Sequence, residues 1–229
     1  MGLSGISGLG GNINPNPQEE GLNSLGGLTG SNVVSLKKGQ KVSLKKAAQD
    51  AGVAGSLSKI HVGLGWDVNK FDGKDFDLDV FTFAVKEDGK VRDEKDFVFY
   101  GNPNPQGLSV SFGGDNRTGQ GSGDDEIILV DLAGIPLDIH KIIFAITIYE
   151  GKERGQNFGM VDNAFVRLAD KNTGKEFLRY DLSEEYSMET AVVVGEMYRH
   201  NGEWKFNAIG SGFKDGLVAL CACYGVSAE

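Results

Sequence analysis

The sequence predicts an all-β protein, a β-sandwich of two antiparallel sheets with a few short helices. From Val33 onward, short segments rich in β-branched and aromatic residues alternate with clusters of Gly, Asp and Asn, the pattern of consecutive antiparallel strands. No amphipathic helical segments stand between them, which argues against a parallel α/β sheet. About eight to ten strands in one domain fit two stacked sheets.

Most of the expected strands are single segments bounded by turn residues. A hairpin around Gly39 is expected over residues 33–44. The expected single strands are 59–68, 75–86, 95–101, 126–132, 141–149, 163–170 and 177–182.

Three segments allow more specific predictions. Residues 141–149 are apolar at almost every position, which predicts a central strand covered on both faces. Residues 190–200 and 203–213 should pair across Asn201-Gly202, a strong hairpin turn signal. Residues 215–226 are the best helical candidate.

The composition predicts the domain boundaries of the chain and its cellular compartment. Residues 1–31 are rich in Gly, Asn, Ser and Pro and predict a flexible N-terminal tail, followed by one domain over 32–229. No apolar run reaches the roughly 18 to 20 residues of a membrane span, and the start lacks the pattern of a secretory signal. Cys221 and Cys223 are expected to be free thiols. A cytoplasmic protein without direct membrane insertion is therefore expected.

The charge balance favours cations as ligands. The chain has 32 Asp and Glu against 23 Lys and Arg, a net charge of −9. This disfavours nucleic acid or an anionic lipid surface as the main partner.

One acidic group lies at the start of the expected strand 75–86. Asp75, Asp77 and Asp79 alternate with apolar residues, so in a strand they share one face, roughly 7 Å apart. Their phase continues as the apolar Phe81 and Phe83, which should be core. The simpler interpretation is an amphipathic strand whose acidic face lies in solvent. Because Phe81 and Phe83 on the same face should be core, we instead expect the carboxylates at the very end of a strand, next to the loops of the sandwich.

A second acidic group occupies the glycine-rich segment 113–126, "GGDNRTGQGSGDDE". Counted from Asp115, it resembles an EF-hand loop with Glu126 in the twelfth position, but Gln120 replaces the obligatory sixth Gly. A disordered linker is the alternative. Because the oxygens of a cluster this acidic repel one another without a cation, the two groups together favour a metal site. The side-chain oxygens come from Asp115, Asn116, Asp124, Asp125 and Glu126.

Calcium suits these groups best, because it takes six to eight oxygen ligands in flexible geometry. Nitrogen-preferring metals are disfavoured, since the lone His61 is better explained as a partly buried residue with its hydrogen bonds satisfied. Glu150 and Asn157 are minor candidates for additional oxygens.

An ordered set of motifs resembles the TerD family of tellurium-resistance and general stress proteins. The set covers roughly residues 33–227; its stretches are 62–67 (VGLGWD), 75–79 (DFDLD), 96–100, 114–126, 156–159, 179–184 and 195–212. The resemblance implies a cytoplasmic β-sandwich that binds two calcium ions at one end and belongs to a stress-response system. Its partners would be other proteins of that system, with a membrane protein complex among the candidates.

Carried onto this chain, the resemblance implies a specific ligand set. Asp67 of the VGLGWD stretch joins the two acidic groups, and glycine carbonyls complete the shells. The implied ligands are Asp67, Asp75, Asp77, Asp79, Asp115, Asn116, Gly119, Gly121, Gly123, Asp124, Asp125 and Glu126.

No catalytic motif is found, and a non-enzymatic calcium-binding module is the leading hypothesis. The chain has no GxSxG, P-loop or HExxH pattern and only three histidines. The alternative is a metal-dependent enzyme that processes phosphoesters or nucleotides with the same carboxylates. It is disfavoured because the sequence places only Arg117 as a cationic residue close to the acidic motifs. A scaffold that assembles through residues 1–31 is a third hypothesis.

Overall fold

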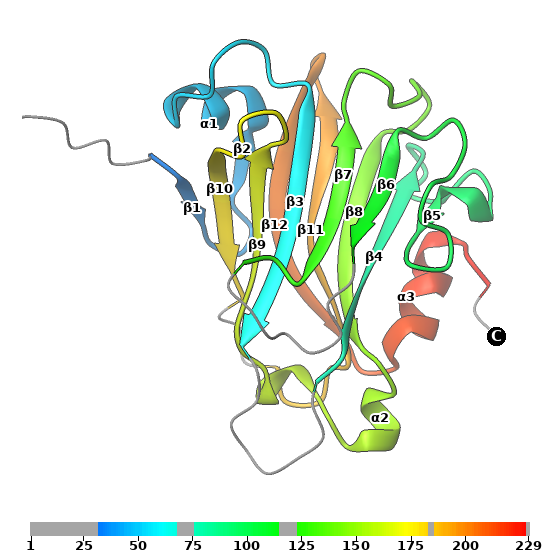
Figure 1. Cartoon of the computed structure of the whole chain (residues 1–229). Helices are drawn as coiled ribbons and strands as arrows, with labels where there is room; N and C mark the ends of the chain where they lie inside the picture. Colours follow the sequence, from blue (N-terminus) through cyan, green and yellow to red (C-terminus); the bar gives the residue numbers. More distant parts are fainter. Residues whose placement is uncertain (1–31, 68–75, 115–122, 183–185, 228–229) are drawn as a thin grey trace, which may run out of the picture. The chain divides into compact units, whose positions relative to one another are not determined.

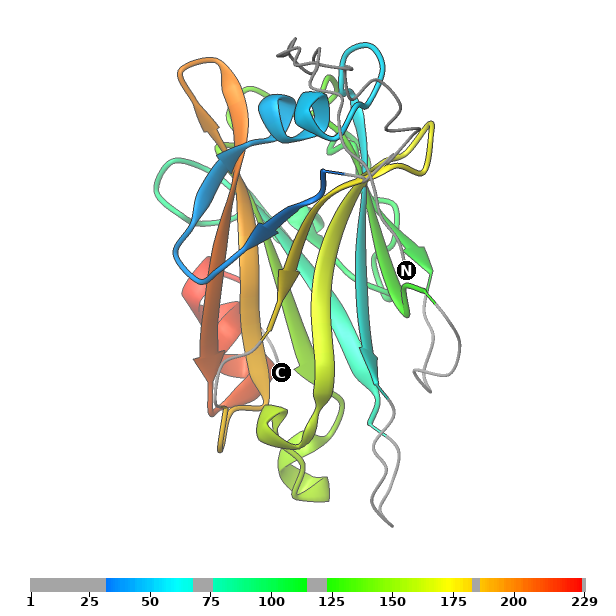
Figure 2. The same ribbon diagram turned by 90° about the vertical axis from the view of Figure 1, so that its left-hand side faces the viewer.

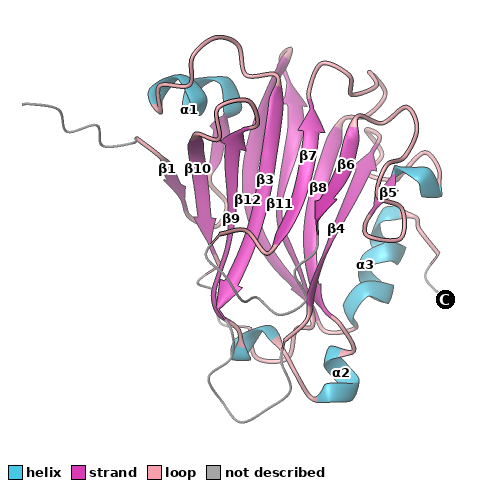
Figure 3. Cartoon of the chain, viewed as in Figure 1, coloured by secondary structure: helices cyan, strands magenta, loops and turns pink. Residues whose placement is uncertain are grey.

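Two six-stranded sheets pack face to face within the residues that the computed structural model describes, 32–67, 76–114, 123–182 and 186–227 (Figures 1 and 3). Contacts divide the chain into two units, Met1–Gly30 and Ser31–Glu229, and both sheets belong to the second unit. The predicted tail, residues 1–31, lies outside the described residues. The predicted β-sandwich is confirmed.

The first sheet has the strand order β1-β10-β9-β3-β7-β6. All its pairings are antiparallel except that between β1 and β10. Its strands are β1 (Val34–Leu36), β10 (Glu176–Asp181), β9 (Asp162–Asp170), β3 (Lys59–Asp67), β7 (Glu126–Asp131) and β6 (Val110–Gly114).

The second sheet has the strand order β2-β12-β11-β8-β4-β5, with antiparallel pairings throughout the described residues. Its strands are β2 (Lys41–Ser43), β12 (Glu203–Phe213), β11 (Ala191–His200), β8 (Lys141–Ile148), β4 (Leu78–Val85) and β5 (Phe97–Val98). The short helices are α1 (Leu44–Asp50), α2 (Gly151–Arg154) and α3 (Gly216–Tyr224), with 3-10 turns η1 (Glu94–Asp96) and η2 (Phe158–Met160).

The main hydrophobic core fills the space between the sheets. On β3, Ile60, Val62, Leu64 and Trp66 belong to this core. Because successive side chains of a strand point to opposite faces, the alternating residues of β3 lie on the outer face of the first sheet. Those residues are His61, Gly63 and Gly65.

A second hydrophobic cluster covers the outer face of the second sheet. Phe81 and Phe83 of β4 pack there with Ile143 of β8 and with Leu220 and Cys221 of α3. Helix α3 therefore closes this face, as Figure 2 shows from the side. Strand β8 contributes side chains to both clusters, so the prediction of a central strand covered on both faces is confirmed.

The β11–β12 hairpin and helix α3 are also confirmed. The turn of the hairpin is Asn201-Gly202, both in the left-handed region, with φ of 52° and 78°. Only residues with a low cost for that conformation suit such a turn. Helix α3 ends at Tyr224 and is capped by Gly225, which has φ of 80°.

The hairpin predicted over residues 33–44 is wrong. Strand β1 pairs parallel with β10 in the first sheet, whereas β2 pairs with β12 in the second. Gly39 turns the chain as expected, with φ of 80°, but its N–H donates to the carbonyl of Ala208 rather than closing a hairpin. Helix α1 was also missed; the Ser43 side chain caps it by accepting from the N–H of Lys46.

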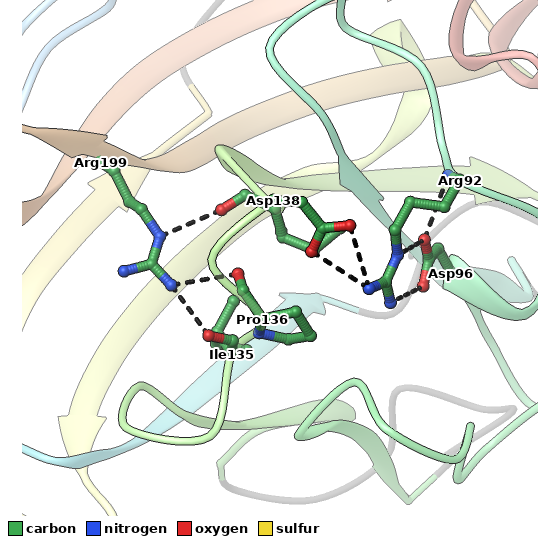
Figure 4. A network of polar contacts seen from close by, with 7 residues as sticks. Arg92, Asp96, Ile135, Pro136, Asp138 and Arg199 are labelled. Carbon is green, nitrogen blue, oxygen red and sulfur yellow. Dashed lines mark hydrogen bonds and ion pairs between the residues drawn. The ribbon is translucent and has the colours of Figure 1, made fainter.

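Two arginines secure the connection between β7 and β8, which crosses from one sheet to the other (Figure 4). Arg199 of β11 donates to the carbonyl oxygens of Ile135 (2.9 Å), Pro136 (3.2 Å) and Ile139 (3.0 Å). Arg92 holds Asp96 through two 2.7 Å bonds and reaches Asp138 at 3.3 Å. This network lies where β8 begins, so the opposite end of the sandwich is free of it.

The described part of the chain contains no helix long and apolar enough to cross a membrane.

Candidate metal site at one end of the sandwich

Described residues of both predicted acidic groups lie toward one end of the sandwich, which we call the acidic end. Strand β3 ends there at Asp67 and β4 begins there at Leu78, while β7 begins at Glu126 a short way before the end of β3 (lower half of Figure 1; Figure 2 gives the side view). Glu126 lies opposite Leu64 of β3 in the strand register. The two sheets therefore each bring carboxylates to the same end.

The structure describes part of the predicted ligand set. Asp75, Asp115, Asn116, Gly119 and Gly121 lie outside the described residues. The described members of the set are Asp67, Asp77, Asp79, Gly123, Asp124, Asp125 and Glu126.

Glu126 and Asp125 are buried carboxylates held against β3. Glu126 is only 1% exposed and shares the strand phase of Ile128, a core residue, so its side chain points between the sheets. Asp125 donates its N–H to the carbonyl of Leu64 (2.7 Å), and its Oδ2 accepts from the N–H of Trp66 (3.0 Å). These contacts place both acidic residues at the edge of the main hydrophobic core.

Asp124 points the other way, onto the outer face of the first sheet. Its Oδ1 lies 2.6 Å from Arg167 Nε, and its Oδ2 lies 2.8 Å from Arg167 Nη2 and 2.6 Å from His61 Nε2. Burial raises the pKa of Asp124, but the hydrogen bonds from His61 and Arg167 outweigh it, and the pKa is lowered. The carboxylate is thus held in its charged form by two neighbours.

The expectation that no cationic residue except Arg117 lies near the acidic motifs is wrong. Arg167 and His61 both contact Asp124. The interpretation of His61 as a partly buried, hydrogen-bonded residue is confirmed. Arg167 was missed because it lies on β9, 43 residues after Asp124, and only the register that pairs it with Gly63 brings the two together.

Asp79 lies on the buried phase of β4, as predicted, but that phase does not face the main core. It continues through Phe81 and Phe83, which pack on the outer face of the second sheet beneath α3. Asp79 lines a cleft of about 490 Å³ there, together with Thr147, Glu150 and Asp215 among others. Asp79 and Glu126 therefore point in different directions from the two sheets.

Asp77 and Asp67 complete the described carboxylates. The carbonyl of Asp77 accepts from the N–H of Tyr149 at 2.7 Å, which fixes the start of β4 beside the end of β8. Asp67 is exposed and accepts a hydrogen bond from the Asn163 side chain. Gly123 has φ of +139°, a conformation that glycine adopts most readily.

The minor candidates Glu150 and Asn157 have local roles. The Asn157 side-chain oxygen accepts from the N–H of Gly159 (2.9 Å) at the start of η2. Glu150 lies 3.5 Å from Arg154 one helical turn later. Within the described residues, no three His, Cys, Asp or Glu side chains are grouped closely enough to hold a metal ion.

The fold and the acidic end define a class: β-sandwich proteins with an oxygen-rich end built from both sheets. The TerD domain matches residues 33–224, and the chain belongs to the TerD family. It is 49% identical to the tellurium resistance protein TerD of Serratia marcescens, over 86% of this chain and 99% of that protein. It is 50% identical to general stress protein 16U of Bacillus subtilis, over 84% and 97% respectively.

Solved structures show the same fold. The crystal structure of a homologue of telluride resistance protein (TerD) from Streptomyces coelicolor A3(2) matches with a TM-score of 0.59 and 25% identity, covering 72% of this chain and 95% of that one. A protein of unknown function matches with a TM-score of 0.61 at 21% identity, covering 76% and 99%. The family predicted from the motifs is confirmed.

Proposed function

We propose that this protein binds calcium at the acidic end and serves the stress response as a non-enzymatic interaction module. The observation that carries the proposal is the convergence of carboxylates from both sheets on one end, with Glu126 and Asp125 buried there. Charged carboxylates are costly to bury unless hydrogen bonds or cations compensate. A bound divalent cation would contribute to that compensation.

The donor chemistry fits calcium. The available groups are carboxylates and carbonyl oxygens, the ligands that calcium prefers. The nitrogen of His61, which stands near the start of β3, already lies 2.6 Å from Asp124. In the sequence, Asp75 lies between β3 and β4, and Asp115 and Asn116 lie between β6 and β7. The residues that would hold calcium are Asp67, Asp75, Asp77, Asp79, Asp115, Asn116, Asp125 and Glu126, with glycine carbonyls. Asp124, a further predicted ligand, contacts Arg167 and His61.

The divergence of Asp79 and Glu126 supports two separate ions rather than one. Asp79 faces the cleft beneath α3, whereas Glu126 faces the space between the sheets. One ion about 2.3 to 2.6 Å from each of its oxygens would not serve two carboxylates that point apart.

Calorimetric titration of the metal-free protein with calcium tests the proposal. We expect two ions per chain and dissociation constants below about 1 mM, the weak end of protein calcium sites. Asp125→Asn should weaken binding, whereas Asp138→Asn, at the opposite end, should not. Absence of binding tighter than about 1 mM would overturn the proposal.

A cleft beside the acidic end supports the interaction role. The exposed side chains of Tyr100 (52%), Tyr149 (42%) and Val218 (60%) all line the cleft that contains Asp79. Clustered apolar groups with a polar rim are typical of protein interaction sites. Glu150, Glu153 and Asp215 also line it, so we propose that it receives a basic segment of another stress-system protein.

The interaction surface can be tested apart from calcium. Tyr100→Ala combined with Val218→Ala, which leaves the charge of the cleft unaltered, should abolish the protein's contribution to tellurite resistance in cells and leave the calcium dissociation constants unchanged. Lys152→Ala, in the same cleft, is the control and should retain resistance. Full resistance in the double variant would contradict the assignment of this cleft.

We expect no enzymatic turnover. A phosphoryl-transfer enzyme needs a cationic group that is available to the substrate. Arg167 and His61 instead hold Asp124, and Lys152 is the one cationic residue among the described residues that line the cleft with Asp79. Hydrolysis of ATP or p-nitrophenyl phosphate with magnesium or manganese, lost in Asp125→Asn, would favour the enzyme hypothesis instead.

A further inference from the structure

We propose that Arg167, assisted by His61, is a positioning residue for the calcium site, and that Asp124 is its anchor rather than a calcium ligand. The inference rests on the proposed calcium site. It assigns a role to a residue of β9 that none of the acidic motifs contains.

The first step is the strength of the anchor. Arg167 contacts both oxygens of Asp124 in the two-pronged geometry that suits a guanidinium and a carboxylate. His61 adds a third contact, and the Asp124 side chain is only 4% exposed. Arg167 is itself held by Glu176 at 3.3 Å. Both Asp124 oxygens therefore already serve cationic or hydrogen-bonding neighbours.

The second step is the recess that receives the carboxylate. Gly63 lies beneath Asp124, and a Cβ added there would stand 2.1 Å from Asp124 Cγ and 2.2 Å from each oxygen. Arg167 is the register partner of Gly63 on β9. The absence of a side chain at Gly63 thus lets Asp124 lie directly on the sheet beside Arg167.

The third step is what the anchor controls. Asp124 comes directly before Asp125, which bonds to Leu64 and Trp66, and Glu126, which begins β7 and points between the sheets. Anchoring Asp124 outward leaves the next two carboxylates in their buried directions. Arg167 therefore determines where the glycine-rich segment rejoins the sheet, and with it where two predicted ligands stand.

Charge and positioning predict opposite effects of removing Arg167. By charge alone, loss of a positive group near a cation site strengthens cation binding. By positioning, loss of the anchor weakens binding, since removing a residue that orients metal ligands typically costs about 10- to 100-fold in affinity. The direction of the change distinguishes the two.

The test measures calcium binding calorimetrically in matched variants. Arg167→Gln should bind calcium about 10-fold or more weakly than the wild type, and Arg167→Lys, which keeps the charge but not the two-pronged contact, should also bind more weakly. Gly63→Ala should weaken binding without any change of charge. Arg179→Gln is the control: Arg179 is the register partner of Arg167 on β10, but pairs with Asp181.

A second readout needs no calcium. In the metal-free protein, amide hydrogen exchange at Asp125, whose N–H bonds to Leu64, should accelerate in Arg167→Gln and Gly63→Ala but not in Arg179→Gln. Circular dichroism confirms that each variant is folded. If Arg167→Gln does not fold, the Arg167→Lys and Gly63→Ala results decide the matter.

The outcomes separate this inference from the calcium proposal. If the wild type does not bind calcium, the proposed function fails. If it binds and the folded Arg167 variants bind equally or more tightly, the positioning role is overturned and Asp124 regains its predicted place among the ligands.

Discussion

The backbone N–H of Trp66 donates a hydrogen bond of 3.0 Å to Oδ2 of Asp125. A carboxylate predicted as a calcium ligand thus also satisfies the backbone of β3 near its end. The Asp125 side chain therefore has a structural role as well as its proposed role as a ligand. Different substitutions of Asp125 can separate the two roles.

Asp125→Ala should lower the stability of the metal-free protein by about 1 to 3 kcal/mol, because it leaves the buried N–H of Trp66 without this acceptor. Asp125→Asn keeps an acceptor oxygen and should cost less. Chemical denaturation without calcium measures both. Equal losses in the two variants would contradict the importance of this hydrogen bond.

Calcium should raise the melting temperature, and chelation should reverse the rise. At a free concentration about 100 times its dissociation constant, each bound ion adds about 2.7 kcal/mol to the stability. Magnesium should give a smaller shift, because it demands stricter octahedral geometry. Scanning calorimetry with calcium, magnesium or EDTA measures this. A calcium shift of undiminished size in Asp125→Asn would mean that neither ion uses the Asp125 carboxylate.

Arg199→Ala should destabilise the protein without altering calcium binding. The change removes hydrogen bonds to the carbonyls of Ile135, Pro136 and Ile139 and the contact of the guanidinium with the Trp204 ring, 4.5 Å from its centroid. Carbonyls left without these donors should make the loss about 1 to 3 kcal/mol or more. Denaturation measures the loss. A changed calcium affinity would mean that the two ends of the sandwich are coupled.

The two cysteines should differ sharply in reactivity. Cys223 is exposed, whereas Cys221 is buried where α3 packs on the second sheet, and burial raises the pKa of its thiol from 9.0 to about 11. A thiol reagent should modify Cys223 rapidly in the native protein and Cys221 only after unfolding. Rapid modification of both in the native state would contradict the packing of α3.

The same pKa shift predicts a loss of stability in alkali. The unfolded chain releases the Cys221 proton near the ordinary pKa of 9.0, whereas the folded protein retains it until about 11, so stability falls as the pH rises between these values. Cys221→Val should reduce this dependence and Cys223→Val should not. Denaturation curves at several alkaline pH values make the comparison.

The parts of the fold that were predicted correctly depend on local pattern. The apolar run 141–149 identified a strand covered on both faces, and Asn201-Gly202 identified a hairpin, because each signal lies within a few residues. The segment around Gly39 was misassigned because a turn glycine is compatible both with a hairpin and with a crossing between sheets. Which strands β1 and β2 pair with depends on β10 and β12, which are far away in the sequence.

The directions of the predicted ligand side chains could be read from the sequence only in part. The alternation of Asp77 and Asp79 with apolar residues correctly indicated a buried phase, but a strand in a sandwich can be covered on either face, and in this protein α3 covers the outer one. The pairing of Arg167 with Asp124 depends on the register of β9 against β3. No spacing along the chain encodes that register.

The crossing at Gly39 has a mechanical consequence. Strand β1 attaches to the first sheet through a three-residue parallel pairing, and β2 attaches to the second through a three-residue antiparallel one. Tension applied at Val33 would therefore detach β1 from β10 before it reached β2, so that the domain yields in two successive steps, one from each sheet.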